Sequence, residues 1–224
     1  MEDMKRFAIY YAPRSSAFAD AAARWLGWDL ARGRSEVQPD VPGLAALTAV
    51  PGKYGFHGTI KPPFRLAEKL SLADLAQAVE ALAKTIAPVR LPGLDLVQID
   101  GFLALIPAPD PALSALADKV VQSLDPFRAA LTEAEIARRR PESLSPRQRD
   151  LLAQFGYPYV MEDFKFHLTL TDRLAGAEGQ RLKVAAARHF AGLIPEPFWL
   201  EDLCLCGEDQ GGRFHLIHRY ALSD

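Results

Sequence analysis

Two short stretches of the chain share one pattern, in which a histidine and a threonine stand two positions apart and an apolar residue follows. They are HGTI at 57–60 and HLTL at 167–170. Because successive side chains of a β-strand point to opposite faces, each stretch would place its histidine and threonine on one face and its apolar residues on the other. An imidazole has a pKa of about 6.5, so near neutral pH one histidine can accept a proton while another donates one.

These groups suit displacement at a phosphorus centre. One histidine would activate the attacking water and the other would protonate the departing oxygen, while the threonine hydroxyls would donate to the non-bridging oxygens. The mechanism needs neither a metal nor a cofactor, and we expect neither. The alternative is a pair of structural histidines beside β-forming threonines, which the two matching contexts disfavour. The candidate catalytic residues are His57, Thr59, His167 and Thr169.

Further polar residues share the parity of the two motifs. Lysine and arginine there would suit a phosphate, arginine through bidentate hydrogen bonds. Solvated charges at a sheet edge are the alternative. Tyr54 falls on the core parity of a regular strand and is left out of the site. The candidate substrate-binding residues are Lys61, Lys165, Thr171 and Arg173.

The elements that must position these motifs follow from apolar periodicity, caps and turn residues. Pro62 and Pro63 are expected to end the strand that carries the first motif. Asp100-Gly101 predicts a hairpin turn. Helices are predicted over 15–30, 71–88, 110–124 and 179–192. Strands are predicted over 6–13, 53–64, 89–99, 102–109, 164–173, 198–209 and 213–223.

The order strand, helix, strand, strand occurs twice along the chain, and each occurrence includes one motif. This recurrence predicts two similar lobes within a single domain, 1–224, and the hairpins beside helices predict an α+β fold. Prolines divide the segment at about 125–157, which is predicted to be a helical insertion. If the two motif strands lie side by side, their polar faces combine into one cleft.

Composition narrows the possible partners. The formal net charge of the 224-residue chain is -2. A charge this close to zero favours neither a nucleic acid nor a membrane surface as a partner. Cys204 and Cys206 face the same side of a predicted strand, where a disulfide is awkward, so free thiols are expected. The segment 1–13 has no apolar stretch of signal-peptide length, and no run of 18 apolar residues occurs. We therefore expect a cytoplasmic protein.

The two motifs, on strands of a duplicated α+β chain, resemble the 2H phosphoesterase superfamily. The resemblance implies a bilobal fold of two antiparallel sheets flanked by helices around a central cleft. It also implies metal-independent hydrolysis of a cyclic phosphodiester by the two histidine-threonine pairs. The flanking stretches KYGFHGTIKPPF and GYPYVMEDFKFHLTLTDR, with RRRPESLSPRQRDLL, resemble a bacterial branch of phosphonate metabolism proteins. That branch suggests a small cyclic or phosphorylated sugar as substrate.

Several alternatives stay open at this stage. The arginines at 138–140 could bind RNA that ends in a 2',3'-cyclic phosphate. A helix face exposed to solvent is the simpler explanation for this basic run. A non-catalytic module that binds a phosphorylated metabolite or RNA is another possibility, and the near-neutral charge disfavours both RNA versions. Gly58 and Pro62 make the first strand less regular than the second, so the two histidines need not be equivalent. Which of them is the base is undecided.

Overall fold

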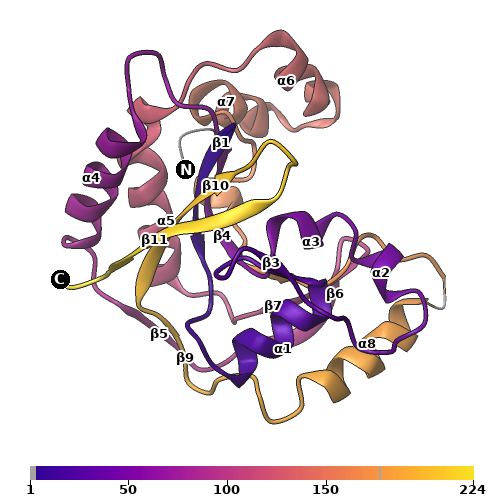
Figure 1. Ribbon diagram of the computed structural model, residues 1–224. Coiled ribbons are helices and arrows are strands. Elements are labelled where there is room, and N and C mark those ends of the chain that lie inside the picture. Colours follow the sequence, from indigo (N-terminus) through magenta and orange to yellow (C-terminus); the bar gives the residue numbers. More distant parts are fainter. Residues whose placement is uncertain (1–3, 177) are drawn as a thin grey trace.

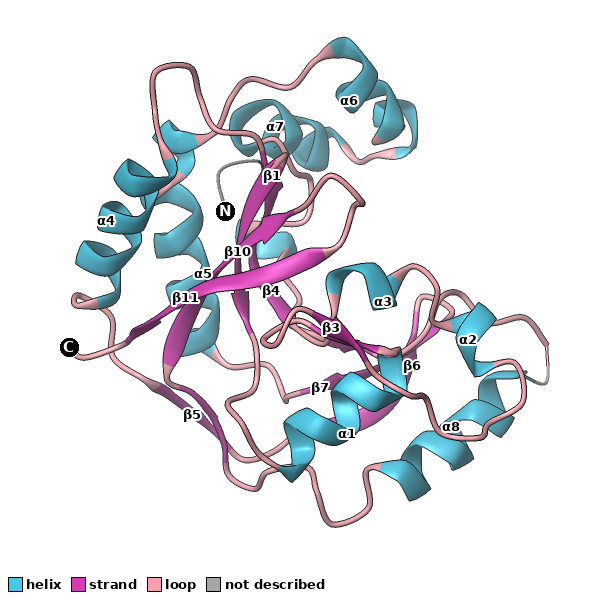
Figure 2. Ribbon diagram, viewed as in Figure 1, coloured by secondary structure: helices cyan, strands magenta, loops and turns pink. Residues whose placement is uncertain are grey.

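The computed structural model describes residues 4–176 and 178–224, and within them the fold is α+β, as predicted. Seven described strands form one antiparallel sheet in the order β11-β10-β1-β4-β8-β7-β6, with helices arranged around it (Figures 1 and 2). In sheet order the strands are Phe214–Ala221, Asp202–Glu208, Arg6–Tyr11, Gly58–Phe64, Leu168–Thr169, Phe102–Ile106 and Asp95–Ile99.

Two small antiparallel sheets accompany the main one. They pair β2 (Trp28–Asp29) with β3 (Arg34–Ser35), and β5 (Val89–Leu91) with β9 (Phe198–Leu200). Within the described residues, no helix is long and apolar enough to cross a membrane.

The longer helices begin and end at residues that suit their ends. Ser16 and Ser71 accept backbone hydrogen bonds at the starts of α1 and α4, Asp110 does so at α5, and Gly27 ends α1 in the left-handed conformation. These helices are α1 (Ala17–Leu26), α4 (Leu72–Ala83), α5 (Pro111–Ser123) and α8 (Glu178–His189). Two short helices, α2 (Leu44–Leu47) and α3 (Pro51–Tyr54), precede β4.

The segment 125–157, which we call the insertion, is built of short helical pieces. Helix α6 (Glu133–Arg138) starts with a capping box, and α7 (Pro146–Phe155) starts with another and ends at Gly156. The 3₁₀ turns η1 (Asp125–Phe127) and η2 (Pro141–Ser143) lie beside them, and η3 (Met161–Asp163) follows. Figure 1 shows α6 and α7 next to the start of β1.

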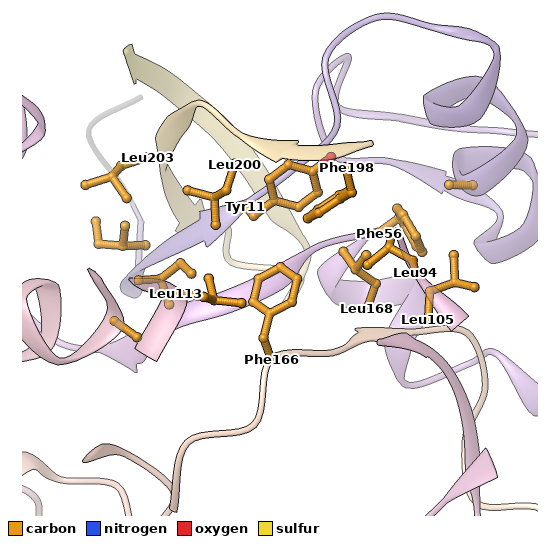
Figure 3. Close-up of a cluster of buried hydrophobic side chains, with 14 of the residues drawn as sticks. Tyr11, Phe56, Leu94, Leu105, Leu113, Phe166, Leu168, Phe198, Leu200 and Leu203 are labelled. Carbon is orange, nitrogen blue, oxygen red and sulfur yellow. The ribbon is translucent and has the colours of Figure 1, made fainter. Parts of the chain in front are cut away.

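One apolar core joins the helices to the sheet. It takes the residues of β1 at odd positions, Phe7, Ile9 and Tyr11, together with side chains of α1, α4, α5 and α8. Figure 3 shows Phe56, Phe166 and Leu168, which immediately flank the two motif histidines, among these buried side chains. The alternation expected from the sequence is therefore present at both motifs.

The structure differs from the sequence-based expectation in how the strands are joined. The two predicted sheets are one sheet, because Gly58 of β4 pairs with Leu168 of β8. The predicted two-lobed duplication stays a prediction. The expected stop at Pro62 and Pro63 is wrong: β4 continues to Phe64, and a register shift against β1 accommodates the two prolines.

Two predicted strands are also shorter or divided. The stretch 164–173 forms only the two-residue strand β8, although side chains still alternate between accessible and buried positions from Lys165 to Leu170. The stretch 198–209 is divided between β9, which pairs with β5, and β10, which pairs with β1. Local alternation cannot indicate which distant strand each part will meet.

Candidate functional site

Pairing of β4 with β8 brings the two motifs together. Gly58 lies opposite Leu168 in antiparallel register. The residues on either side therefore face each other, His57 beside Thr169 and Thr59 beside His167, all on one face of the sheet. All four are partly accessible, whereas the apolar residues between them are buried. We call these four side chains the motif cluster.

The ring of His57 is fixed through its Nδ1 atom. Nδ1 lies 2.8 Å from the carbonyl oxygen of Gly55, and Nε2 lies 3.2 Å from the Oγ1 atom of Thr59. Because a carbonyl can only accept, Nδ1–H must be the donor to Gly55. In the neutral ring Nε2 then carries the lone pair, and the Thr59 hydroxyl donates to it.

His167 is held in the same way. Its Nδ1 atom lies 2.7 Å from the carbonyl oxygen of Lys165, which stands two positions earlier, as Gly55 does before His57. Its Nε2 atom has no hydrogen-bond partner among the described residues. Both motifs thus anchor Nδ1–H to a backbone carbonyl, an arrangement that fixes the tautomer of the neutral ring with its lone pair on Nε2.

Burial disfavours the protonated, positively charged form of His57. Desolvation lowers its pKa from 6.5 to about 4, against the opposing effect of the Gly55 carbonyl, and the nearby His167 lowers it further. His57 is therefore neutral near pH 7, with its lone pair on Nε2.

Two tyrosines surround His57: Tyr10, which the sequence did not single out, and Tyr54, which lies in helix α3 rather than on the core side of a strand as expected. The ring of Tyr10 stacks on His57 at 3.9 Å between centroids, and the ring of Tyr54 lies 6.0 Å away. Tyr10 is fully buried and lies opposite Thr59 in the β1–β4 ladder. Tyr54 stacks in turn on Phe214, at 5.1 Å. Only the strand pairing reveals Tyr10, because nothing within residues 6–11 sets it apart.

A glycine allows the two motif strands to approach. A Cβ atom added at Gly58 would lie 2.4 Å from ring atoms of Phe166, far inside van der Waals contact. Phe166 is buried and contacts the rings of Tyr11 and Phe198 on the core side of the sheet. The irregularity that Gly58 suggested in the sequence is thus a close contact between the two motifs.

The second motif is held by contacts outside its short strand. The indole Nε1–H of Trp25 donates to the Leu170 carbonyl at 2.9 Å, and the Leu170 amide donates to the Leu103 carbonyl at 2.8 Å. The Asp172 amide donates to the Leu47 carbonyl at 2.7 Å. Helix α1, strand β7 and helix α2 therefore fix this segment although β8 has only two residues.

Two of the candidate substrate-binding residues have structural partners. Lys61 is 1% exposed, and its Nζ donates to the Val121 carbonyl at 3.1 Å and to Asp125 at 3.3 Å. Burial lowers the pKa of Lys61 to about 8, against the attraction of Asp125. Thr171 is also 1% exposed, and its Oγ1 accepts from the Leu103 amide. The structure does not bring these two side chains to the motif cluster.

The other two candidates lie at the surface. Lys165 is exposed, and it is its backbone carbonyl that contacts His167. Arg173 is exposed near the hairpin turn at Gly101. Their charges are available to a ligand, and a role for them stays a prediction.

The remaining histidines and the cysteines have structural surroundings. His189 bonds the Ala21 carbonyl through Nε2, and His215 contacts Asp209. Cys204 and Cys206 are free thiols buried in β10, as expected, and burial raises the pKa of both. In the part of the chain that the structure describes, no three His, Cys, Asp or Glu side chains gather as metal ligands.

Comparison with known proteins places the chain in a family. Residues 59–215 match the family described as "Protein of unknown function (DUF1045)", and the chain belongs to it. The chain is 36% identical over 222 residues to the ribose 1,5-bisphosphate phosphokinase PhnN of Janthinobacterium sp. (strain Marseille), covering 94% of this chain and 49% of that protein. It spans about half the length of the curated relatives it matches.

Solved structures are similar at lower identity. Escherichia coli LigT complexed with 3'-AMP is 15% identical with a TM-score of 0.49, covering 99% of this chain and 100% of that chain. A structure described as a phosphoesterase is 16% identical with a TM-score of 0.42, with the same coverage of both chains.

Proposed function

We propose that the chain is a metal-independent 2H-type phosphoesterase that hydrolyses a cyclic phosphodiester by two-histidine acid-base catalysis. The observation that supports this most strongly is the motif cluster. Two imidazoles and two hydroxyls share one face of neighbouring strands, and both imidazoles are fixed through Nδ1 with Nε2 directed away from the backbone. Two histidines with a purely structural role would not need the same Nδ1 hydrogen bond in both motifs.

In the proposed mechanism, His57 is the base and His167 is the acid. His57 is neutral near pH 7, so its Nε2 can accept a proton from the attacking water. As the bond from the water oxygen to phosphorus forms, the bond from phosphorus to one ester oxygen of the cyclic phosphate breaks. That ester oxygen takes a proton from Nε2 of His167. The Thr59 hydroxyl, which donates to Nε2 of His57 in the structure, turns on substrate binding to donate, together with Thr169, to the non-bridging oxygens, where negative charge accumulates.

The substrate class that we propose is a cyclic phosphate of ribose. The curated relatives, of which this chain spans about half, are named for ribose 1,5-bisphosphate. Adding water across the phosphorus–O2 bond of ribose 1,2-cyclic phosphate that carries a 5-phosphate would leave phosphates on O1 and O5. That product is ribose 1,5-bisphosphate, so such a hydrolase could supply the molecule for which those proteins are named.

The test is phosphorus NMR in the presence of a chelator. The substrates are ribose 1,2-cyclic phosphate with and without a 5-phosphate, a 2',3'-cyclic nucleotide and a linear phosphodiester. We expect a cyclic resonance to disappear, and we expect His57→Ala or His167→Ala to slow its loss by about 10²- to 10⁴-fold. His218→Ala, which removes an exposed histidine from β11, is the matched control. Persistence of every cyclic resonance would refute the function, and full activity of either motif variant would refute the mechanism.

A further inference from the structure

A cavity lies at the end of the main sheet, next to the insertion. Its volume is about 650 Å³, and it is bounded by the ends of β1, β4 and β10 and by the insertion. Arg6 and Glu208 line it from the sheet, and Arg138 and Arg139 line it from the insertion. Tyr54 also lines it. Figure 1 shows α6 and α7 beside the start of β1. We call it the basic cavity.

Strand β1 connects the basic cavity to the motif cluster. Arg6 and Tyr10 stand four positions apart on β1 and therefore face the same side of the sheet, about 13 Å apart along the strand. Tyr10 stacks on His57, and Tyr54 has its ring 6.0 Å from His57 while lining the cavity. Tyr54 therefore belongs both to the surroundings of the motif cluster and to the lining of the basic cavity.

The charge of the cavity contrasts with that of the whole chain. Among the described residues that line it, seven are lysine or arginine and two are glutamate. The complete chain carries a formal net charge of -2. Cationic side chains gathered in one hollow of a mildly acidic protein raise the local concentration of an anionic ligand.

Some of these cations have carboxylate partners and frame the cavity. Arg65 forms two hydrogen bonds with Glu135, whose pKa falls to about 2, chiefly because of these bonds. Arg128 forms two with Asp125. The Ala129 amide also donates to the Arg65 carbonyl, which ties the insertion to the chain that follows β4. These contacts hold the wall of the cavity in place.

Two arginines of the insertion are not neutralised. No carboxylate of the described residues forms an ion pair with Arg138 or Arg139. Arg138 uses Nε for the Ala134 carbonyl, at 3.3 Å. The guanidinium carbon of Arg139 lies 4.8 Å from the ring centroid of Tyr157, a contact that orients it. Their remaining N–H groups are available to an anion.

We infer that the basic cavity binds a second phosphate of the substrate, one that does not react, so that the substrate is a doubly phosphorylated small molecule. This inference rests on the proposed function. The planar forks of Arg138 and Arg139 match the oxygens of a phosphate. The cations are confined to one cavity beside the motif cluster, which favours a single phosphate group over the extended backbone of RNA.

The test compares ribose 1,2-cyclic phosphate with and without a 5-phosphate. The wild-type protein should prefer the 5-phosphorylated sugar in kcat/KM by at least about 10-fold. The double variant Arg138→Gln/Arg139→Gln should lose about 10- to 100-fold on that sugar and little on the other. Arg140→Gln is the matched control, because Arg140 belongs to the same basic run but does not line the cavity. Equal losses on both sugars, or no loss, would overturn the inference.

A binding measurement separates this inference from the proposed function. Inorganic phosphate is titrated calorimetrically into a protein carrying His57→Ala and His167→Ala, with and without the two arginine substitutions. We expect the arginine substitutions to weaken phosphate binding by at least about 10-fold, whichever sugars are hydrolysed. If neither sugar reacts, the proposed function fails, and unchanged phosphate affinity overturns the anion site on its own. Faster cleavage of a short RNA ending in a 2',3'-cyclic phosphate, with steep salt dependence, would also overturn the small-molecule inference.

Discussion

Acidification should destabilise the fold through His57. In the native state burial lowers the pKa of this histidine to about 4, whereas in the unfolded chain it is about 6.5. The unfolded chain therefore binds the proton at a higher pH than the native protein does. The contribution of His57 to stability is complete above about pH 6.5 and is lost as the pH falls from about 6.5 to about 4.

The size of this loss follows from the two pKa values. The difference corresponds to about 3 kcal/mol of unfolding free energy once the pH lies below both values, and about 2 kcal/mol of it is already lost at about pH 5. The hydrogen bond from His57 Nδ1–H to the Gly55 carbonyl persists in both protonation states, so it is the burial of charge that costs free energy.

The assay is urea unfolding at about pH 7.5 and about pH 5. Carboxylates elsewhere also respond to pH, so the informative quantity is the difference between variants. Between the two pH values, the unfolding free energy of the wild type should fall by about 2 kcal/mol more than that of His57→Gln. The unfolding free energy of His218→Gln should fall as much as that of the wild type. Equal losses for wild type and His57→Gln would refute the assignment of a desolvated, neutral His57.

Three further outcomes are expected. The acid limb of kcat/KM should lie near pH 4 to 5 if His57 is the base in the free enzyme, and a limb at or above about pH 6.5 would contradict that assignment. Gly58→Ala should lower the unfolding free energy by about 1 to 3 kcal/mol, because its Cβ would collide with Phe166; an unchanged urea midpoint would show that the strands can separate freely. Tyr10→Phe should raise the urea midpoint or leave it unchanged, because the buried Tyr10 hydroxyl has no hydrogen-bond partner among the described residues; clear destabilisation would reveal a partner.

Elements with strong local signals were predictable from the sequence. The capping box of Ser71 and Asp74 starts α4, and the turn at Asp100 and Gly101 has φ angles of 48° and 88°, as a tight hairpin requires. Pairings between distant segments were not predictable. The register shift that admits Pro62 and the division of 198–209 between two sheets depend on strands far away in the chain.

The site shows the same limit. Alternation within each motif indicated that histidine and threonine share a face, and the structure places both motifs on adjacent strands. It could not indicate that Tyr10 stacks on His57, or that Lys61 turns away to Asp125. The arginines at 138–140 were visible as a basic run, but only the docking of the insertion shows which of them line a cavity.

The two motifs have the same local geometry and different surroundings, and this difference is what can assign their roles. In each motif, the backbone carbonyl two positions before the histidine accepts a hydrogen bond from Nδ1–H, because the backbone has the same local course in both segments. His57, however, stacks on the fully buried Tyr10 and accepts from Thr59, whereas Nε2 of His167 has no partner among the described residues. Burial disfavours only the charged form of an imidazole, so the packing around His57 lowers its pKa although its backbone contact matches that of His167. A base and an acid can thus arise from one repeated motif when the packing around its two copies differs.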